Sequence, residues 1–345
     1  MKRIQLHAYA KINLTLDVTG KRPNGYHDVE MIMQQISLCD EVTVSWEAGS
    51  VRRGKPGQTA EPDPTGIQIQ LTVSRPDLPA DSSNLAWKAT EEMIAEFGGP
   101  AGGNAKTAAG TDAAGGVLTI DIQKQIPMAA GLAGGSSNCA AVLHAINQLW
   151  ELNLSVKELC RIGARLGSDV PFCIMGQAAA EKALQESFAD DPDACHCALA
   201  TGTGTNLKPL TGLDSFIVLS KPAIGVSTAE VYRGIDNEGI PRHPDNNAVI
   251  SAICENNYKV LEKKMVNVLE NFALKRYPII VYTKNIMSDL CQSAGIPNCV
   301  MMSGSGPTVF CLCEELSKAQ QICEVMKSRN PESFVAKTTG VEQAS

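Results

Sequence analysis

The stretch Pro127–Ala141 has the composition of a loop that binds phosphate. It reads PMAAGLAGGSSNCAA, and the small side chains of residues 129–135 let backbone N–H groups approach a ligand closely. Ser136 and Ser137 stand where a helix is expected to begin, because apolar residues then recur at helical spacing. The N-terminus of a helix offers unpaired N–H donors and the positive end of a dipole. This arrangement suits an anion, above all phosphate.

The loop differs from the two best-known nucleotide-binding patterns. No Gly-x4-Gly-Lys-Ser/Thr sequence occurs, so it is not a P-loop. The pattern Gly-x-Gly-x-x-Gly with a downstream ribose-binding acid is missing as well. The alternative to a phosphate-binding loop is therefore a glycine-rich turn that only packs closely against its neighbours.

Lys11 and Asp169 are the charged residues whose surroundings suggest chemistry. Lys11 stands among Ala, Ile and Leu in an apparent strand, where a charge needs a partner; the alternative is an edge-strand lysine that extends its ammonium into solvent. Asp169 lies in a Gly-Ser-Asp-Val-Pro turn. A carboxylate there could take the proton of a substrate hydroxyl during phosphoryl transfer, and the alternative is a turn or cap residue.

The overall composition excludes several function classes. The chain has 345 residues, 44% of them hydrophobic, and a net charge of −7, which argues against a nucleic-acid or membrane-surface binder. The N-terminus lacks the apolar core of a signal peptide and no run reaches transmembrane length, so we expect a cytoplasmic protein. The cluster Cys195-His196-Cys197 has no second ligand pair at zinc spacing, which favours a polar loop over a metal site.

Strand and helix patterns alternate irregularly, which predicts an α+β fold in two domains, residues 1–180 and 181–345. Expected strands are 3–18, 31–44, 67–73, 117–122, 216–221, 308–312 and 333–338. Expected helices are 84–97, 156–166, 247–253, 258–274, 286–294 and 316–329, together with the one that follows the glycine loop. Residues 48–66 and 98–116 are predicted to be exposed insertions, and 186–208 an irregular loop.

Three motifs resemble those of the GHMP kinase superfamily, in the same order. Pro127–Ser137 resembles its nucleotide-binding motif, Ala8–Leu14 its first motif and Met302–Phe310 its third. Arg22–His27, Gly167–Phe172 and Lys221–Ala229 are similar to segments of the 4-diphosphocytidyl-2-C-methyl-D-erythritol kinase family within it.

The resemblance implies a fold and an activity. The fold would combine an N-terminal domain like ribosomal protein S5 domain 2 with a ferredoxin-like C-terminal domain. The activity would be ATP-dependent phosphorylation of the 2-hydroxyl of the CDP-linked methylerythritol, in the non-mevalonate isoprenoid route. Another small-alcohol GHMP kinase, of homoserine or mevalonate type, and a catalytically weak ligand-binding member remain alternatives.

The resemblance also assigns roles to residues. Lys11 and Asp169 would be catalytic, with the lysine keeping the aspartate ionised. Tyr26 and Tyr232 would stack on the two faces of cytosine, and His27 would hydrogen-bond its edge. Further substrate contacts would come from Asn13, Lys124 and Thr228. ATP would bind Pro127, Met128, Ala129, Ala130, Gly131, Leu132, Ala133, Gly134, Gly135, Ser136 and Ser137.

The remaining expectations concern metal, partners and departures from the family. Mg²⁺ is expected with ATP; Ser137 is a candidate contact, and no carboxylate ligand is named. The expected partner is a small molecule, without nucleic acid or membrane, for a monomer or homodimer. Alanines 129, 130 and 133 replace frequent glycines, which puts the loop conformation in question. Residues 178–186 replace a Gly-x-Gly-Glu ending, keep only its glutamate as Glu186, and favour helix.

Overall fold

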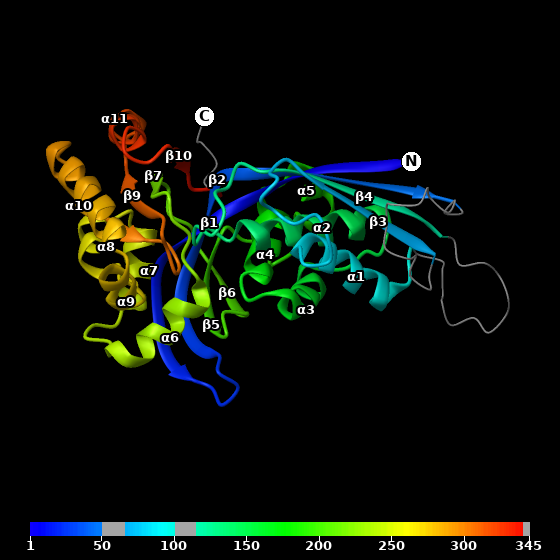
Figure 1. The fold of residues 1–345 in the computed structure, drawn as a ribbon, viewed down its shortest axis with the longest axis horizontal. Helices are drawn as coiled ribbons and strands as arrows, with labels where there is room; N and C mark the ends of the chain where they lie inside the picture. Colours follow the sequence, from blue (N-terminus) through cyan, green and yellow to red (C-terminus); the bar gives the residue numbers. More distant parts are fainter. Residues whose placement is uncertain (50–65, 101–114, 341–345) are drawn as a thin grey trace. The chain divides into compact units, whose positions relative to one another are not determined.

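The computed structural model describes residues 1–49, 66–100 and 115–340, so most of the two expected insertions lies outside it (Figure 1). The strands are β1 (Lys2–Lys21), β2 (His27–Ala48), β3 (Ile67–Val73), β4 (Gly116–Gln123), β5 (Cys197–Gly202), β6 (Asn206–Leu210), β7 (Phe216–Lys221), β8 (Val300–Met302), β9 (Val309–Cys313) and β10 (Glu332–Lys337). The helices are α1 (Leu85–Phe97), α2 (Gly134–Leu149), α3 (Val156–Leu166), α4 (Val170–Ala180), α5 (Lys182–Phe188), α6 (Thr228–Glu238), α7 (Asn246–Cys254), α8 (Tyr258–Lys264), α9 (Glu270–Arg276), α10 (Pro278–Ser293) and α11 (Leu316–Lys327). No helix in these ranges is both long and apolar enough to span a membrane.

The chain forms two compact units that interleave along the sequence. The first consists of Met1–Ala8, Cys39–Gln125 and Gly134–Ala194, and the second of Tyr9–Leu38, Ile126–Ala133 and Cys195–Ser345. The predicted division into 1–180 and 181–345 stays a prediction.

In the first unit, helices α1 to α5 accompany a small stretch of sheet. The second half of β2 pairs antiparallel with β4, from Glu41 opposite Gln123 onward, and β4 pairs parallel with β3. Helix α2 packs against α1 and α4, and α3 packs against α4. Because α2 is buried along most of its length, its first turn is held in place by this helical layer.

In the second unit, a four-stranded antiparallel sheet has the order β10-β7-β9-β8. Helices α6 to α10 connect β7 to β8, and α11 connects β9 to β10. This is the β-α-β-β-α-β arrangement of a ferredoxin-like fold, as predicted. The first half of β2 also belongs to this unit, where it pairs with β5, and β5 pairs with β6.

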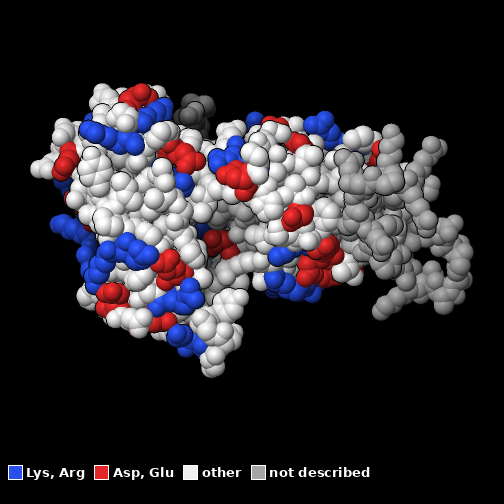
Figure 2. All heavy atoms as spheres, in the orientation of Figure 1, with Lys and Arg blue, Asp and Glu red and all other residues white. Residues whose placement is uncertain are grey.

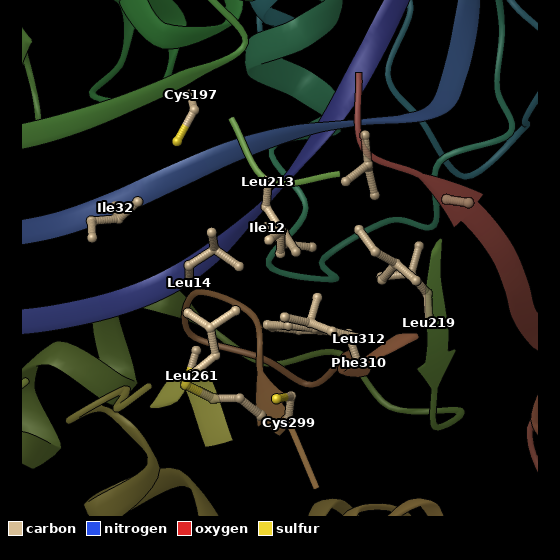
Figure 3. Close-up of a cluster of buried hydrophobic side chains, with 14 of the residues drawn as sticks. Ile12, Leu14, Ile32, Cys197, Leu213, Leu219, Leu261, Cys299, Phe310 and Leu312 are labelled. Carbon is tan, nitrogen blue, oxygen red and sulfur yellow. The ribbon is translucent and has the colours of Figure 1, made fainter. Parts of the chain in front are cut away.

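The core of the second unit determines which face of β1 carries polar groups. Figure 3 shows Ile12 and Leu14 of β1 beside Phe310 and Leu312 of β9, and all four are fully buried or nearly so. Side chains alternate along a strand. The apolar face formed by residues 12 and 14 therefore directs Lys11 and the residues that alternate with it to the other face of β1.

Two expected elements differ from the structure because tertiary bonds override local preference. Residues 186–208 are not an irregular loop, since β5 and β6 form there and β2 satisfies the backbone of β5. The helix expected at 258–274 is broken into α8 and α9. Between them Leu16 of β1 exchanges backbone bonds with Val266 and Val268, at 2.9 Å each. The helical preference of residues 178–186 is confirmed by α4 and α5.

Candidate functional site

The glycine loop of the second unit lies directly against the third motif. The Ser303 hydroxyl donates to the Gly131 carbonyl at 3.0 Å. Gly131 has a φ of +74°, and a Cβ at this position would stand 2.2 Å from the carbonyl oxygen of Ser303. Only glycine permits both this backbone conformation and this close approach.

A buried asparagine that the sequence analysis missed orients the third motif. The Asn267 amide nitrogen donates to the carbonyls of Met302 and Gly304 at 2.8 Å each, and its oxygen accepts from the Leu269 N–H at 3.0 Å. The amide therefore uses both its donor and acceptor groups. No local pattern marks Asn267, because the two carbonyls to which it donates lie more than thirty residues away in the chain.

The first motif joins the same assembly through Lys11. Its backbone N–H donates to the Leu132 carbonyl at 3.1 Å, and its ammonium donates to the Asn13 side-chain oxygen at 2.7 Å. The Asn13 amide lies 3.2 Å from the sulfur of Met31. Lys11 is only 4% exposed, so the alternative of a lysine that extends into solvent is wrong. The second unit thus brings together residues of all three motifs.

The alanines of the loop adopt backbone conformations that usually favour glycine. Ala129 has a φ of 47° and Ala133 a φ of 59°. The left-handed region costs a residue with a Cβ about 1–2 kcal/mol. The loop therefore keeps left-handed turns at two of the three positions where glycine was expected.

Helix α6 carries the predicted substrate residues Thr228 and Tyr232 on one face, at a spacing of four residues. The Thr228 and Ser305 hydroxyls are 2.9 Å apart, which ties the start of α6 to the third motif. The Tyr232 ring lies 5.3 Å from that of His27. Tyr26 is 63% exposed, so one aromatic ring next to the buried His27 is open to solvent.

The end of α6 supplies a residue that the sequence analysis also missed. Asp236 accepts a hydrogen bond from Nε2 of His27 at 2.7 Å and forms an ion pair with Lys21 at 2.6 Å. These two bonds from the β1–β2 hairpin lower the pKa of the Asp236 carboxyl below its usual value, Lys21 contributing most. In Figure 1 this hairpin and α6 lie side by side.

In the first unit, the start of α2 has the features of an anion site. Gly134, Gly135 and Ser136 are not buried, and the first turn contains no acidic residue that would oppose a phosphate. Ser137 is fully buried, and the Gln177 amide donates to its carbonyl at 2.9 Å and contacts its hydroxyl at 3.3 Å.

Asp169 directly precedes α4 and is half-buried. It occupies the N-cap position and its side chain forms no capping bond to that helix, so its catalytic role stays a prediction. Its position at the helix start is maintained by the backbone, where its carbonyl accepts from the Cys173 N–H at 3.1 Å.

Lys124 belongs to a buried polar cluster at the start of the loop. Its ammonium is paired with Asp40 and lies 3.1 Å from the Asn138 side-chain oxygen. Asp40 also accepts from the Gln125 N–H at 2.7 Å and from the Asn138 amide at 2.8 Å. The Lys124 side chain is 4% exposed, and its contact with substrate stays a prediction. Asp40 was missed because it lies far from the loop in sequence.

The described residues contain no group of three or more His, Cys, Asp or Glu side chains arranged to hold a metal ion. At the Cys195-His196-Cys197 cluster, Cys197 begins β5 and the His196 ring is bonded to the Gln35 side chain at 2.9 Å. On the face shown in Figure 2, Lys and Arg atoms lie beside Asp and Glu atoms at several places.

Family models match both parts of the chain. Residues 84–177 match the GHMP kinases N terminal domain, and residues 249–332 match GHMP kinases C terminal.

Curated relatives match over nearly the whole length. A 4-diphosphocytidyl-2-C-methyl-D-erythritol kinase of Alkaliphilus metalliredigens is 39% identical, over 94% of this chain and 92% of the relative. One from Geobacillus thermodenitrificans is 37% identical over 98% of each.

Solved structures agree with the sequence matches. A crystal structure of 4-(cytidine 5'-diphospho)-2C-methyl-D-erythritol kinase superposes with a TM-score of 0.70 at 26% identity, covering 98% of this chain and all of that one. A homoserine kinase from Cytophaga hutchinsonii gives a TM-score of 0.62 at 16% identity, over 98% of this chain and 95% of that one, which shows the shared fold alone.

Proposed function

The chain belongs to the GHMP kinase family, and from this premise we propose that it transfers a phosphoryl group from ATP to the 2-hydroxyl of 4-diphosphocytidyl-2-C-methyl-D-erythritol. The products are the 2-phosphate and ADP. The observation that carries the proposal is the assembly in the second unit, where the glycine loop, Lys11 and the third motif contact one another. The same unit contains the His27–Tyr232 pair that a cytosine base would need.

The ATP phosphates bind at residues 127–137 in this proposal. The exposed backbone at the start of α2 supplies N–H donors, and Gly131 lets the loop seat against Ser303. Mg²⁺ supplies neutralisation of charge on the phosphates when it is bound. Phosphate oxygens would provide most of its ligands, because the Ser137 hydroxyl is fully buried and contacts the Gln177 amide.

Asp169 and Lys11 divide the chemistry between them. The Asp169 carboxylate takes the proton of the substrate hydroxyl, which is a poor nucleophile at neutral pH. The Lys11 ammonium stabilises negative charge on the reacting oxygens, and Asn13 fixes its direction through the bond at 2.7 Å. A buried ammonium acts more strongly than an exposed one because less water screens it.

The cytidine is recognised by residues of the β1–β2 hairpin and α6. The exposed Tyr26 ring stacks on one face of the base and Tyr232 on the other, while His27 hydrogen-bonds the base edge. Thr228 contacts the substrate from the start of α6, and Lys124 contacts it with an ammonium that is shared with Asp40. We further propose that the protein is cytoplasmic and acts as a monomer or homodimer. Its two domains would be residues 1–180 and 181–345.

A coupled assay of ADP release tests this function. The full chain is given ATP with the CDP-linked methylerythritol, with homoserine or with mevalonate. Turnover of the first alone is expected. Turnover of either other alcohol alone would assign a different kinase, and binding of the CDP-linked compound without ADP release would indicate a ligand-binding protein. Asp169→Asn should lower kcat by roughly 100-fold or more with substrate binding intact, as loss of a general base does.

A further inference from the structure

The contact between Asp236 and His27 determines which ring nitrogen of the histidine can accept a hydrogen bond. The His27 side chain is 6% exposed, and its Nε2 lies 2.7 Å from the Asp236 carboxylate. An ionised carboxylate only accepts hydrogen bonds. Nε2 must therefore carry the hydrogen, and in the neutral ring Nδ1 then carries a lone pair.

The lone pair on Nδ1 matters for the choice of base. Cytosine presents an amino group, a hydrogen-bond donor, where uracil presents a carbonyl oxygen, an acceptor. A histidine whose Nδ1 is an acceptor can accept from the cytosine amino group and meets the uracil oxygen with two lone pairs opposed. Without Asp236, either nitrogen of the neutral ring can carry the hydrogen.

We propose that Asp236 is a positioning residue that determines base specificity, because it holds His27 in the form that accepts a hydrogen bond from cytosine. This inference rests on the proposed function, in which His27 meets the cytidine. Asp236 itself bonds to His27 and Lys21, so its effect on the base would pass through His27. Its place on α6, one turn beyond Tyr232, orients the imidazole and the stacking ring from the same helix.

The competing explanation is that Asp236 only anchors α6 to the hairpin. The ion pair with Lys21 at 2.6 Å serves that purpose without touching His27. Lys21→Met removes this anchor and leaves the bond to His27 in place. The two roles therefore separate in two variants, Asp236→Ala and Lys21→Met.

Helix α6 also offers a matched control. Glu238 is an acid two residues from Asp236, and it pairs with Lys275 near the surface. Glu238→Gln removes a charge of the same sign from the same helix without altering a contact to His27. We expect it to behave as the parent protein in every measurement below.

The first measurement is the protonation of His27 itself. In ¹⁵N spectra of the histidine-labelled full chain near neutral pH, the parent, Lys21→Met and Glu238→Gln should show hydrogen on Nε2 of His27. His27→Gln identifies the resonance among the five histidines. Asp236→Ala should show a mixture of the two neutral forms. A pure Nε2–H form in Asp236→Ala would overturn the inference.

The second measurement is base preference, with cytidine 5'-diphosphate and uridine 5'-diphosphate as the probes in calorimetry. The parent should prefer the cytidine compound, and Asp236→Ala should lose about tenfold of that preference, as expected for one hydrogen bond to the base. Asp236→Asn should retain part of it, since an amide oxygen still accepts from Nε2. Lys21→Met should keep the preference whatever its stability.

The outcomes distinguish failure of this inference from failure of the proposed function on which it rests. If the parent turns over the CDP-linked substrate and Asp236→Ala keeps the full cytidine preference, Asp236 does not set the base and the kinase assignment stands. An equal loss in Lys21→Met would show that the residue is an anchor, which also overturns the inference. If the parent neither turns over that substrate nor prefers cytidine, the proposed function fails, and the spectra alone then show whether Asp236 controls the ring.

Discussion

Replacing Gly131 with alanine should separate close backbone packing from conformational strain in the glycine loop. The new Cβ would lie 2.2 Å from the Ser303 carbonyl oxygen, and real Cβ contacts are not shorter than 3.0 Å. The loop and the third motif must therefore move apart by roughly 0.8 Å, which strains packing by about 1–3 kcal/mol. The left-handed φ of +74° destabilises the folded state by about a further 1–2 kcal/mol, because alanine has a Cβ. Alanine also makes the unfolded chain less flexible, which offsets about 0.4–1 kcal/mol of this loss. Gly131→Ala should therefore lower the free energy of unfolding by about 3 kcal/mol.

Gly295 is the matched control for this substitution. It has a φ of +66° in the same unit, and nothing lies within 4 Å of a Cβ placed there. Gly295→Ala therefore reports the conformational strain alone, about 1 kcal/mol. The difference between the two variants measures the contact with Ser303.

Thermal unfolding and kinase assays give the two readouts. Gly131→Ala should lower the Tm by about 5–10 °C and Gly295→Ala by about 2–4 °C. The shift of the loop should lower kcat/KM for ATP by about 100-fold in Gly131→Ala, because misplacement of about 1 Å is enough for such a loss, and leave it unchanged in Gly295→Ala. Equal changes of Tm, together with an ATP kcat/KM within threefold of the parent, would refute the reasoning.

Three further predictions concern strain, a buried charge and pH. Ala129→Gly and Ala133→Gly should each raise the free energy of unfolding by about 0.5–1 kcal/mol, since relief of left-handed strain exceeds the added chain entropy; denaturant titration showing a loss would contradict this. Asp40→Ala removes the carboxylate paired with the buried Lys124 ammonium and should destabilise the chain by about 3–5 kcal/mol, which an unchanged unfolding midpoint would exclude. His144 is buried with its pKa lowered to about 4 by desolvation, so the unfolded chain binds a proton between pH 6.5 and 4 that the folded chain does not. Stability should therefore fall as the pH drops through this window, by about 3 kcal/mol from this residue, and His144→Gln should flatten the curve; equal slopes in both proteins would count against it.

The glycine loop and the helix that follows it were largely predictable because their requirements are local. A loop that approaches phosphate needs small residues, and the helix that follows needs a regular apolar pattern; both are contiguous in Pro127–Ala141. Helix α2 begins at Gly134, two residues before the predicted start at Ser136, and Lys11 lies in β1 as predicted. The failures have a physical cause as well. The helix expected at 258–274 is interrupted where its backbone forms hydrogen bonds with β1. Residues 197–202 form a strand because β2 supplies hydrogen bonds to their backbone.

The sequence by itself determined the identity of the three motifs, the family they resemble and the residue types available for phosphoryl transfer. The tertiary structure alone decided which side chains hold those residues in place. Asp236 meets His27 across 209 positions of the chain, Asp40 meets Lys124 across 84, and Asn267 reaches Gly304 across 37. Local patterns record what the backbone of one segment requires, whereas a buried hydrogen-bond partner is selected by the packing of distant elements. The positioning groups therefore become visible only when the chain is folded.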